Sequence, residues 1–375
     1  ANRIAVPKGD EDLKQKTKFC FDFLKDLKEK GSPSGVTLHQ LYAKPNKGKY
    51  REGEEYEITK ESLGEGNMSA GKILVVKDKT TGKENAMKTV MIADFREDEV
   101  QCWIDLNDSG LPPRLYLFHY DSSDNKVKFH MEPLKKAKLL QEVIDEHMGK
   151  MWRTNSELVK PFSLCMFDNV LSAIKTMTDK NWTHGDLHGK NIMLDNKMRL
   201  RVLDFGRAKP LSVDTTSGKG DNFKMDILEA VRKFTALYLG YEFEDQFDLK
   251  ANWTQMLSDE RLSSVEERSD LFNLIDSALR IQHPSDIPQV KDTIQKMLLD
   301  KKRDDIMREV ARLLFPEEDL ESYSTMDGPR VYVGYTVGNI HYTVGDKPRR
   351  YNCVSNSISN IYLSEPQNTV RLSPK

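Results

Sequence analysis

Residues 183–195, THGDLHGKNIMLD, carry more polar groups than a buried strand or helix would ordinarily tolerate. His184, Asp186, His188 and Asn191 fall within eight residues, and an apolar run follows them. A carboxylate such as Asp186 could accept a proton from an attacking hydroxyl group. Taken alone, the stretch also fits a polar surface turn, so the residues that surround it in the sequence decide between the two interpretations.

Two short apolar runs, NIML and RLRVLDF, flank the turn residues DNK and predict a β-hairpin. The ends of this hairpin would bring Asn191 close to Asp204, which stands directly before Phe205 and Gly206. A carboxylate oxygen beside an amide oxygen is a hard-oxygen site that suits Mg²⁺ with some of its waters and with phosphate oxygens. We therefore expect Asn191 and Asp204 to be metal ligands.

The elements that must position these residues change character along the chain. Residues 10–31 have the pattern of an amphipathic helix that ends at Gly31. Its apolar residues include Leu13, Phe23, Leu24 and Leu27. From about residue 56 to residue 131 the sequence predicts two pairs of strands with a helix at about 95–106 between them. After residue 139 the apolar spacing is helical. The fold class is therefore α+β, with a small β-rich lobe followed by a larger helical lobe.

The carboxy-terminal part differs from both lobes. It contains YTVGNIHYTVGD, in which two copies of YTVG are each followed by Asn or Asp. Alternating apolar residues around a Gly–Asn pair predict a β-hairpin. We expect residues 316–375 to form a β-rich extension that offers a surface for a protein partner.

In combination, these motifs resemble the protein-kinase-like superfamily, in which H-x-D-x-x-x-x-N is followed by D-F-G. The resemblance implies a two-lobed fold that binds ATP and Mg²⁺, with Asp186 as the catalytic base and with Asn191 and Asp204 as metal ligands. It divides the chain into an amino-terminal helical extension, an N-lobe, a C-lobe and a carboxy-terminal extension. These parts span residues 1–50, 51–134, 135–315 and 316–375.

Two upstream motifs add to the resemblance. NAMK is similar to the strand lysine that holds the α- and β-phosphates, which implies this role for Lys88. Glu99 lies 11 residues later on the expected helix, where the family's ion-pair partner belongs, with Glu97 and Asp98 as alternatives. The stretch FHMEPL resembles the hinge between the lobes. The resemblance then places the adenine pocket beside Met131, Glu132 and Leu134.

GEGNMSAGKI nearly spells a P-loop, because Gly66, Gly71 and Lys72 have the G-x-x-x-x-G-K spacing. Ile73 stands where a hydroxyl should hold Mg²⁺, and the residues after it favour a strand instead of a helix. We interpret the stretch as a kinase glycine-rich loop lengthened by two residues. Gly64, Gly66 and Gly71 would cover the phosphates.

Three departures from the family lie in the catalytic loop and in the segment after the D-F-G. Gly185 replaces the arginine that reads a phosphate on the activation segment, which implies that no such switch operates. His188 replaces the lysine typical of serine/threonine kinases, and either contacts the γ-phosphate or packs within the loop. No A-P-E follows Gly206, and only about 20 residues separate the D-F-G from Asp226, which we expect to brace the catalytic loop.

The interpretation that these features favour is a serine/threonine protein kinase with a short activation segment that needs no phosphorylation. The loop HGDLH also resembles small-molecule kinases, such as those that act on aminoglycosides or choline. A pseudokinase, or a kinase fold that transfers AMP, stays open as well.

Composition limits the partners. The 375 residues carry a net charge of -2, which argues against a dominant electrostatic grip on nucleic acid. No apolar run is long enough to span a membrane. Four cysteines lack the CxxC spacing of a zinc site. We expect a cytoplasmic, intracellular protein whose partners are ATP and a protein substrate, and the sequence leaves open delivery into a host cell.

Overall fold

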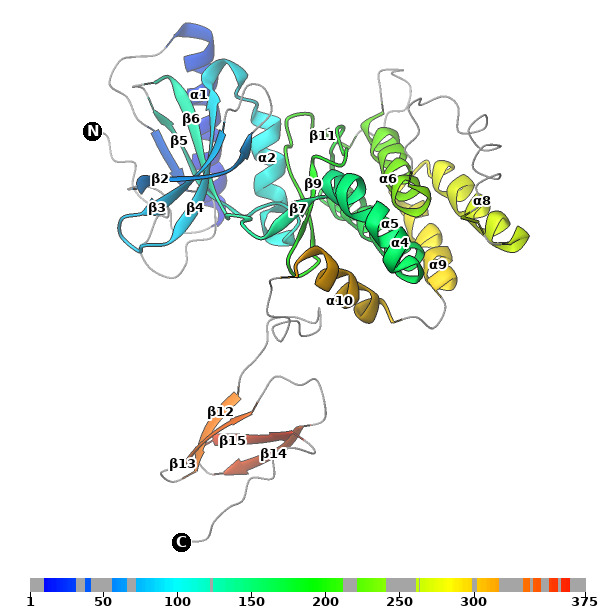
Figure 1. Ribbon diagram of the computed structural model, residues 1–375. Coiled ribbons are helices and arrows are strands. Elements are labelled where there is room, and N and C mark those ends of the chain that lie inside the picture. Colours follow the sequence, from blue (N-terminus) through cyan, green and yellow to red (C-terminus); the bar gives the residue numbers. More distant parts are fainter. Residues whose placement is uncertain are drawn as a thin grey trace. The chain divides into compact units, whose positions relative to one another are not determined.

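The computed structural model describes the chain with gaps (Figure 1). The described residues are 10–31, 38–41, 56–65, 72–121, 124–211, 221–240, 261–262, 264–298, 302–316, 333–337, 340–344, 351–356 and 359–364. By its internal contacts the chain divides into two units, Ala1–Asp319 and Leu320–Lys375.

The amino-terminal part of the first unit contains an antiparallel sheet with the strand order β1-β5-β6-β4-β3-β2. These strands are β1 (Leu38–Leu41), β2 (Tyr56–Glu65), β3 (Lys72–Asp78), β4 (Glu84–Met91), β5 (Leu115–Asp121) and β6 (Lys126–Met131). The two expected strand pairs are present as β3–β4 and β5–β6. Strand β1, which pairs with β5 at the edge of the sheet, was not predicted.

Two helices pack on one face of this sheet, α1 (Asp10–Lys30) and α2 (Glu97–Leu106) (Figure 1). The ring of Phe21 on α1 lies 6.3 Å from that of Phe118, and Trp103 on α2 stacks on Phe129. The predicted helix end is confirmed, because Gly31 has φ +85° and its N–H donates to the carbonyl of Leu27. The amphipathic helix is present. Of the apolar residues named for it, Leu24 and Leu27 are buried and Phe23 is half-buried, while the side chain of Leu13 lies outside the described residues; Phe21 is buried as well.

The second part of the first unit is mainly helical and is built around α5 (Ser156–Asp179), whose side chains are mostly buried. The helices that contact α5 include α6 (Asn222–Leu239), α9 (Ile287–Leu298) and α10 (Arg303–Leu314). Phe167 of α5 stacks on Phe234 of α6 at 4.6 Å. The remaining described helices here are α3 (Leu140–Glu142), a π-helix (Val143–Met148), α4 (Gly149–Thr154) and α8 (Val265–Leu279). The π-helix was not predicted.

Two small sheets in this helical part present the polar stretch 183–195 and the D-F-G triplet. One has the order β10-β9-β7 and the other pairs β11 with β8. Their strands are β7 (Ala137–Leu139), β8 (Trp182–Thr183), β9 (Ile192–Asp195), β10 (Leu200–Val202) and β11 (Lys209–Pro210). The predicted hairpin is present as β9–β10, with Ile192 opposite Val202.

The second unit contains two hairpins, which are considered by themselves. The first pairs β12 (Val333–Val337) with β13 (Ile340–Val344) around residues 338–339, as the YTVG pattern predicted. The second, which pairs β14 (Tyr351–Asn356) with β15 (Ser359–Ser364), was not predicted.

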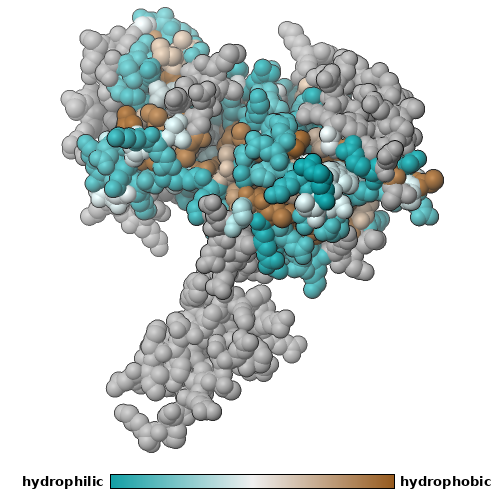
Figure 2. Space-filling view, viewed as in Figure 1, coloured by the Kyte–Doolittle hydropathy of each residue, from teal (hydrophilic) through white to brown (hydrophobic). Residues whose placement is uncertain are grey.

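The described surface is mainly hydrophilic, and its hydrophobic residues form small patches (Figure 2). The large hydrophobic side chains exposed there are Ile58, Met91, Val265, Phe272 and Leu313. Within the described part of the chain, no helix combines the length and the hydrophobicity that a membrane crossing requires.

Candidate functional site

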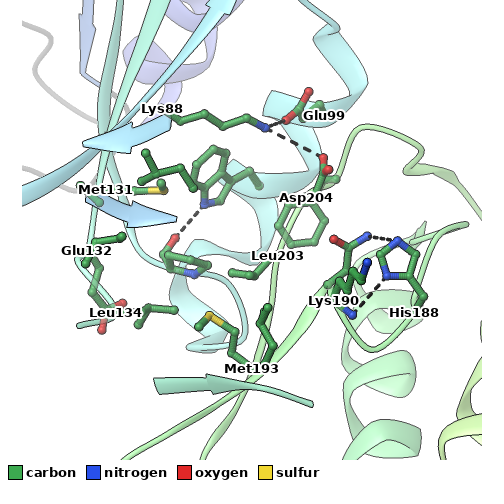
Figure 3. Close-up of a pocket in the computed structure, with 18 residues that line it drawn as sticks. Lys88, Glu99, Met131, Glu132, Leu134, His188, Lys190, Met193, Leu203 and Asp204 are labelled. Carbon is green, nitrogen blue, oxygen red and sulfur yellow. Dashed lines mark hydrogen bonds and ion pairs between the residues drawn. The ribbon is translucent and has the colours of Figure 1, made fainter. Parts of the chain in front are cut away.

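A pocket of about 540 Å³ lies between the sheet and the helical part of the first unit (Figure 3). This volume suits a small organic ligand or cofactor. Ile73 and Ala86 line it from the sheet, and Met193 and Leu203 line it from β9 and the end of the β9–β10 hairpin. Eight of the residues singled out in the sequence line this one pocket: Lys88, Glu99, Met131, Glu132, Leu134, His188, Asn191 and Asp204.

Lys88 on β4 forms an ion pair with Glu99 on α2, with 2.8 Å between Nζ and Oε1. Asp204 Oδ1 lies 3.9 Å from the same ammonium group (Figure 3). Burial alone would lower the pKa of Lys88, but the two carboxylates outweigh it and raise that pKa above its ordinary value. The geometry selects Glu99 among the three acids that begin α2. The ammonium is thus held as a fixed positive charge at one end of the pocket.

Asn191 and Asp204 are brought together by the β9–β10 hairpin, since the N–H of Leu203 donates to the carbonyl of Asn191 at 2.8 Å. The Asn191 amide nitrogen donates to the carbonyl of Asp186 at 2.8 Å, which leaves the amide oxygen for another partner. Asp204 adopts φ +55°, a strained conformation for a residue with a Cβ, and such strain is concentrated at functional sites. One carboxylate and one amide oxygen form a donor set that fits Mg²⁺.

The loop before Asn191 is braced from below by Asp226 on α6, as the sequence predicted. Its two carboxylate oxygens accept the backbone N–H groups of His184 at 2.7 Å and Gly185 at 2.8 Å. Burial raises the pKa of Asp226 to about 7, against the lowering effect of these two hydrogen bonds. Asp186 is therefore attached to a loop whose backbone is fixed in place.

His184 is fully buried and has a structural role. Its Nδ1 accepts the N–H of Asp186 at 3.2 Å, so Nε2 carries the proton and donates to the carbonyl of Leu203 at 2.9 Å. Burial lowers the pKa of this imidazole, which favours the neutral ring. His184 thus connects the loop that carries Asp186 to the strand end that carries Asp204.

Asp186 is not among the residues that line the pocket, but its carboxylate contacts two that do, Asn191 and His188. Its Oδ2 is 3.4 Å from the Asn191 amide nitrogen and 3.6 Å from His188 Nε2. Its Oδ1 is 3.6 Å from Nη1 of Arg207. The Asp186 side chain is 23% exposed, so a hydroxyl group arriving from solvent could reach this carboxylate beside the Asn191 amide group.

The ring of His188 lies within the loop and makes one hydrogen bond to the loop's backbone. Its Nδ1 accepts the N–H of Lys190 at 3.2 Å, a role that is open only to an unprotonated ring nitrogen. Nε2 lies 3.3 Å from the Asn191 amide nitrogen, and because both groups are then donors this contact is packing and not a hydrogen bond. Of the two roles that the sequence left open for His188, these contacts favour packing within the loop over contact with a phosphate.

The hinge residues occupy the opposite side of the pocket from Lys88 (Figure 3). The side chain of Glu132 is turned to Arg201 on β10, which is almost fully buried and also donates to the carbonyl of Pro112 at 2.9 Å. Burial raises the pKa of Glu132, but the hydrogen bonds from Arg201 and from the Arg114 N–H lower it more, so the pKa lies below its usual range. The Glu132 carboxylate is thus committed to Arg201.

The glycine-rich stretch is only partly described. Gly64 lies on β2 opposite Ile73, within a stretch where the pairing register of β2 and β3 shifts. Gly66 and Gly71 lie outside the described residues. Their expected contact with phosphates stays a prediction.

Apart from apolar residues of the pocket wall, four residues with polar or charged groups were missed in the sequence. Trp103 and Lys190 line the pocket, Arg201 holds the hinge, and Arg207 faces Asp186. Arg207 could have been placed near the site from the sequence, because it directly follows the D-F-G triplet. The hydrogen-bond partners of Arg201 lie 69 and 89 residues away in the sequence, and the nearby Asp195, at 3.7 Å, does not by itself mark it as part of the site.

Comparisons with known proteins show which family this part of the chain resembles. Residues 57–227 match the family model described as the protein kinase domain. The chain is 26% identical over 187 residues to the serine/threonine-protein kinase PKH2 of Candida albicans, which covers 48% of this chain and 18% of that protein. It is 26% identical to the serine/threonine-protein kinase ksg1 of Schizosaccharomyces pombe, covering 48% of this chain and 30% of that protein.

The chain is also similar to the 3-phosphoinositide-dependent protein kinase 1 of Rattus norvegicus, with 25% identity over 43% of this chain and 28% of that protein. In each of these three alignments the chain spans less than a third of the relative's length.

Proposed function

Residues 57–227 belong to the protein kinase family, and from this premise we propose that the protein is an ATP- and Mg²⁺-dependent serine/threonine protein kinase. One observation carries the proposal. The ammonium of Lys88, paired with Glu99, and the side chains of Asn191 and Asp204 line one pocket, and the Asp186 carboxylate lies beside Asn191.

These residues divide the work of phosphoryl transfer. Lys88 binds the α- and β-phosphates of ATP, and Glu99 fixes the position of its ammonium group. Asp204 and Asn191 hold Mg²⁺, which when bound neutralises charge on the phosphate oxygens. Asp186 orients the acceptor hydroxyl and accepts its proton. Positioning and electrostatics, rather than covalent chemistry by the protein, supply the rate.

The adenine would lie between Ala86 on the sheet and Met193 below it, beside the hinge. Backbone groups from residue 132 to residue 134 would bind its edge. The Glu132 side chain is paired with Arg201, and its backbone N–H donates to the carbonyl of Arg114 at 2.8 Å, so the groups we propose for the adenine edge are the Glu132 carbonyl and the Leu134 N–H. This arrangement supports a purine site of the kind that the resemblance implied.

The activation segment is short, and its ends are joined. The Asn222 amide nitrogen at the start of α6 donates to the carbonyl of Arg207 at 3.1 Å. Gly185 has φ +74°, and a Cβ at this residue would lie 2.4 Å from the same amide nitrogen. No arginine side chain could start from this position without displacing Asn222. The proposal therefore includes activity that needs no phosphorylation of this segment.

Transfer of label from ATP tests the proposal. The purified full chain is incubated with Mg²⁺, a generic basic protein and ATP labelled at either the γ- or the α-phosphate. A protein kinase labels itself or the basic protein from γ-labelled ATP only, and Asp186→Ala abolishes the label. Asp179→Ala, which removes an exposed carboxylate at the end of α5, is the matched control and should keep it.

Other outcomes identify the alternatives. Label from the α-phosphate would indicate AMP transfer. Unlabelled protein together with phosphate transfer to a metabolite pool would indicate a small-molecule kinase. Neither signal, despite a bound nucleotide, would indicate a pseudokinase.

For the second unit, residues 320–375, we propose binding of a protein partner. Support comes from its separation as a unit with two hairpins. Deleting residues 320–375 should leave transfer of phosphate to the basic protein intact and remove a partner recovered by the full chain.

A further inference from the structure

We propose that Arg207 is a catalytic residue that contacts the transferring phosphoryl group from the acceptor side. The inference rests on the proposed function, because it assigns a further residue to that reaction.

Residue 188 of the catalytic loop is a histidine whose ring is turned to the loop itself, because its Nδ1 accepts the backbone N–H of Lys190. A phosphoryl group in transfer carries negative charge on three oxygens, and cations placed around it lower the barrier. A cation from outside residues 183–191 could therefore stand beside Asp186 and take this role.

Two lysines line the described pocket, Lys88 on β4 and Lys190 on the catalytic loop beside His188 (Figure 3). Lys88 is committed to Glu99 and Asp204, and Lys190 lines the nucleotide pocket. Among the described residues, the basic side chains within 4 Å of the Asp186 carboxylate are those of His188 and Arg207. Among the described lysines and arginines, Arg207 is thus the one whose side chain lies within 4 Å of the Asp186 carboxylate.

Arg207 is held by its backbone while its side chain stays exposed. Its backbone carbonyl accepts a hydrogen bond from Asn222 and packs against Gly185, so its Cα is fixed beside the catalytic loop. Its side chain is 71% exposed. The 3.6 Å gap to Asp186 is longer than the roughly 2.7–2.9 Å of a charge-assisted hydrogen bond. The guanidinium group is therefore anchored at its root and free to move to an arriving phosphate oxygen.

In the reaction, the acceptor oxygen forms a bond to the γ-phosphorus while the bond from that phosphorus to the β–γ bridging oxygen breaks. The electron pair of the broken bond leaves with ADP. The acceptor proton goes to Asp186. Arg207 donates hydrogen bonds to the transferring oxygens, and its planar fork can engage two of them at once. It gives up no proton in this step.

The test is steady-state kinetics with γ-labelled ATP and the basic protein, on the full chain. Arg207→Ala should lower kcat about 100-fold, in the range found when one donor to a developing charge is removed. KM for ATP should change less than about threefold, because Lys88 and the hinge still bind the nucleotide. Guanidinium ion added at millimolar concentration should restore part of the lost kcat, which a merely structural role would not allow.

Lys209→Ala is the matched control, because Lys209 is another exposed cation two residues further along the same segment. It should retain wild-type kcat. The inference is overturned if Arg207→Ala keeps wild-type kcat, or if its loss is not rescued by guanidinium. An inactive wild type overturns the proposed function itself, and the inference with it.

Discussion

Gly185 immediately precedes the proposed catalytic base, and its replacement by alanine gives a sharp test of how the catalytic loop is built. Gly185 has φ +74°, in the left-handed region that a residue with a Cβ adopts at a cost. An added Cβ would lie 2.4 Å from the Asn222 amide nitrogen and 3.0 Å from the carbonyl oxygen of Arg207. Asn222 would have to move, and its hydrogen bond to Arg207 would break.

The size of the effect comes from these two contributions. The left-handed backbone costs an alanine about 1–2 kcal/mol. Loss of the Asn222 hydrogen bond costs about 1 kcal/mol more. Gly185→Ala should therefore lower the free energy of unfolding by about 2–3 kcal/mol. In an Asn222→Ala background the hydrogen bond is already absent, so the same change should cost only the backbone strain, about 1–2 kcal/mol.

Urea unfolding of the four proteins of this double-mutant cycle measures the coupling. Gly110→Ala is the matched control, because Gly110 has φ +72° with nothing within 4 Å of the position of an added Cβ. It should cost the strain alone and leave kcat unchanged. Gly185→Ala should also lower kcat about 100-fold, since a displacement of about 1 Å at Asp186 is enough for such a loss. Equal costs for Gly185→Ala with and without Asn222 would refute this account of the loop.

Three further predictions concern the supports of the site. Asp226→Asn should remove a pH dependence of stability. In the wild type the pKa of Asp226 is about 7 in the folded state and 3.8 in the unfolded state. Protonation of Asp226 therefore stabilises the folded state at low pH, and this contribution to the free energy of unfolding is lost as pH rises from about 4 toward 7. Unfolding free energies of the two proteins between pH 5 and 8 should diverge below pH 7, by at most about 1.4 kcal/mol per pH unit, and parallel curves would contradict the raised pKa. Glu132→Gln should lower the free energy of unfolding by about 2 kcal/mol and raise KM for ATP, since it leaves buried Arg201 without its main charged partner. If neither value changes, the hinge does not depend on this ion pair. Phe21→Ala should lower the free energy of unfolding by about 3 kcal/mol, measured by thermal unfolding, because Phe21 is buried against the sheet. Phe23→Ala should lower it distinctly less, because Phe23 is half-buried. The reverse order would argue against the packing of α1 on the sheet.

The parts of the site that could be predicted from the sequence depend on local spacing. Turn residues between two apolar runs identified the β9–β10 hairpin, and the hairpin alone is enough to bring Asn191 beside Leu203 and Asp204. An 11-residue separation pointed from Lys88 to Glu99, although three adjacent acids made the choice depend on the resemblance. The structure selects Glu99, whose side chain turns inward on α2.

The sequence of α1 contained the helical spacing of its buried face, which distinguishes Phe21 from Phe23. The buried residues Thr17, Cys20, Phe21, Leu24 and Leu27 on α1 recur at the spacing of one helix face. Phe23 is off this stripe, so strict application of the helical period would have placed it at the margin of the interface.

Arg201 shows what local reasoning cannot reach. In the sequence it is a charged residue inside the short strand RLRVLDF, where an exposed position is the ordinary expectation. It is buried because the hinge and the segment after α2 both place acceptors against it from far along the chain. Only the assembled sheet and helices show that a guanidinium group fits there.

The environment of Asp186 connects the short activation segment to the proposed chemistry. Asp226 fixes the backbone before Asp186 from α6, and Asn222, four residues earlier on the same helix, fixes the carbonyl of Arg207. Side chains of one helix, α6, therefore position both Asp186, the proposed base, and Arg207, which faces it. In this arrangement the relative position of Asp186 and Arg207 is determined by folding, because the contacts that hold them are made by side chains of the chain itself. Under the proposed function, a phosphate added to the segment between Arg207 and Asn222 would therefore not be needed to bring Asp186 and Arg207 together.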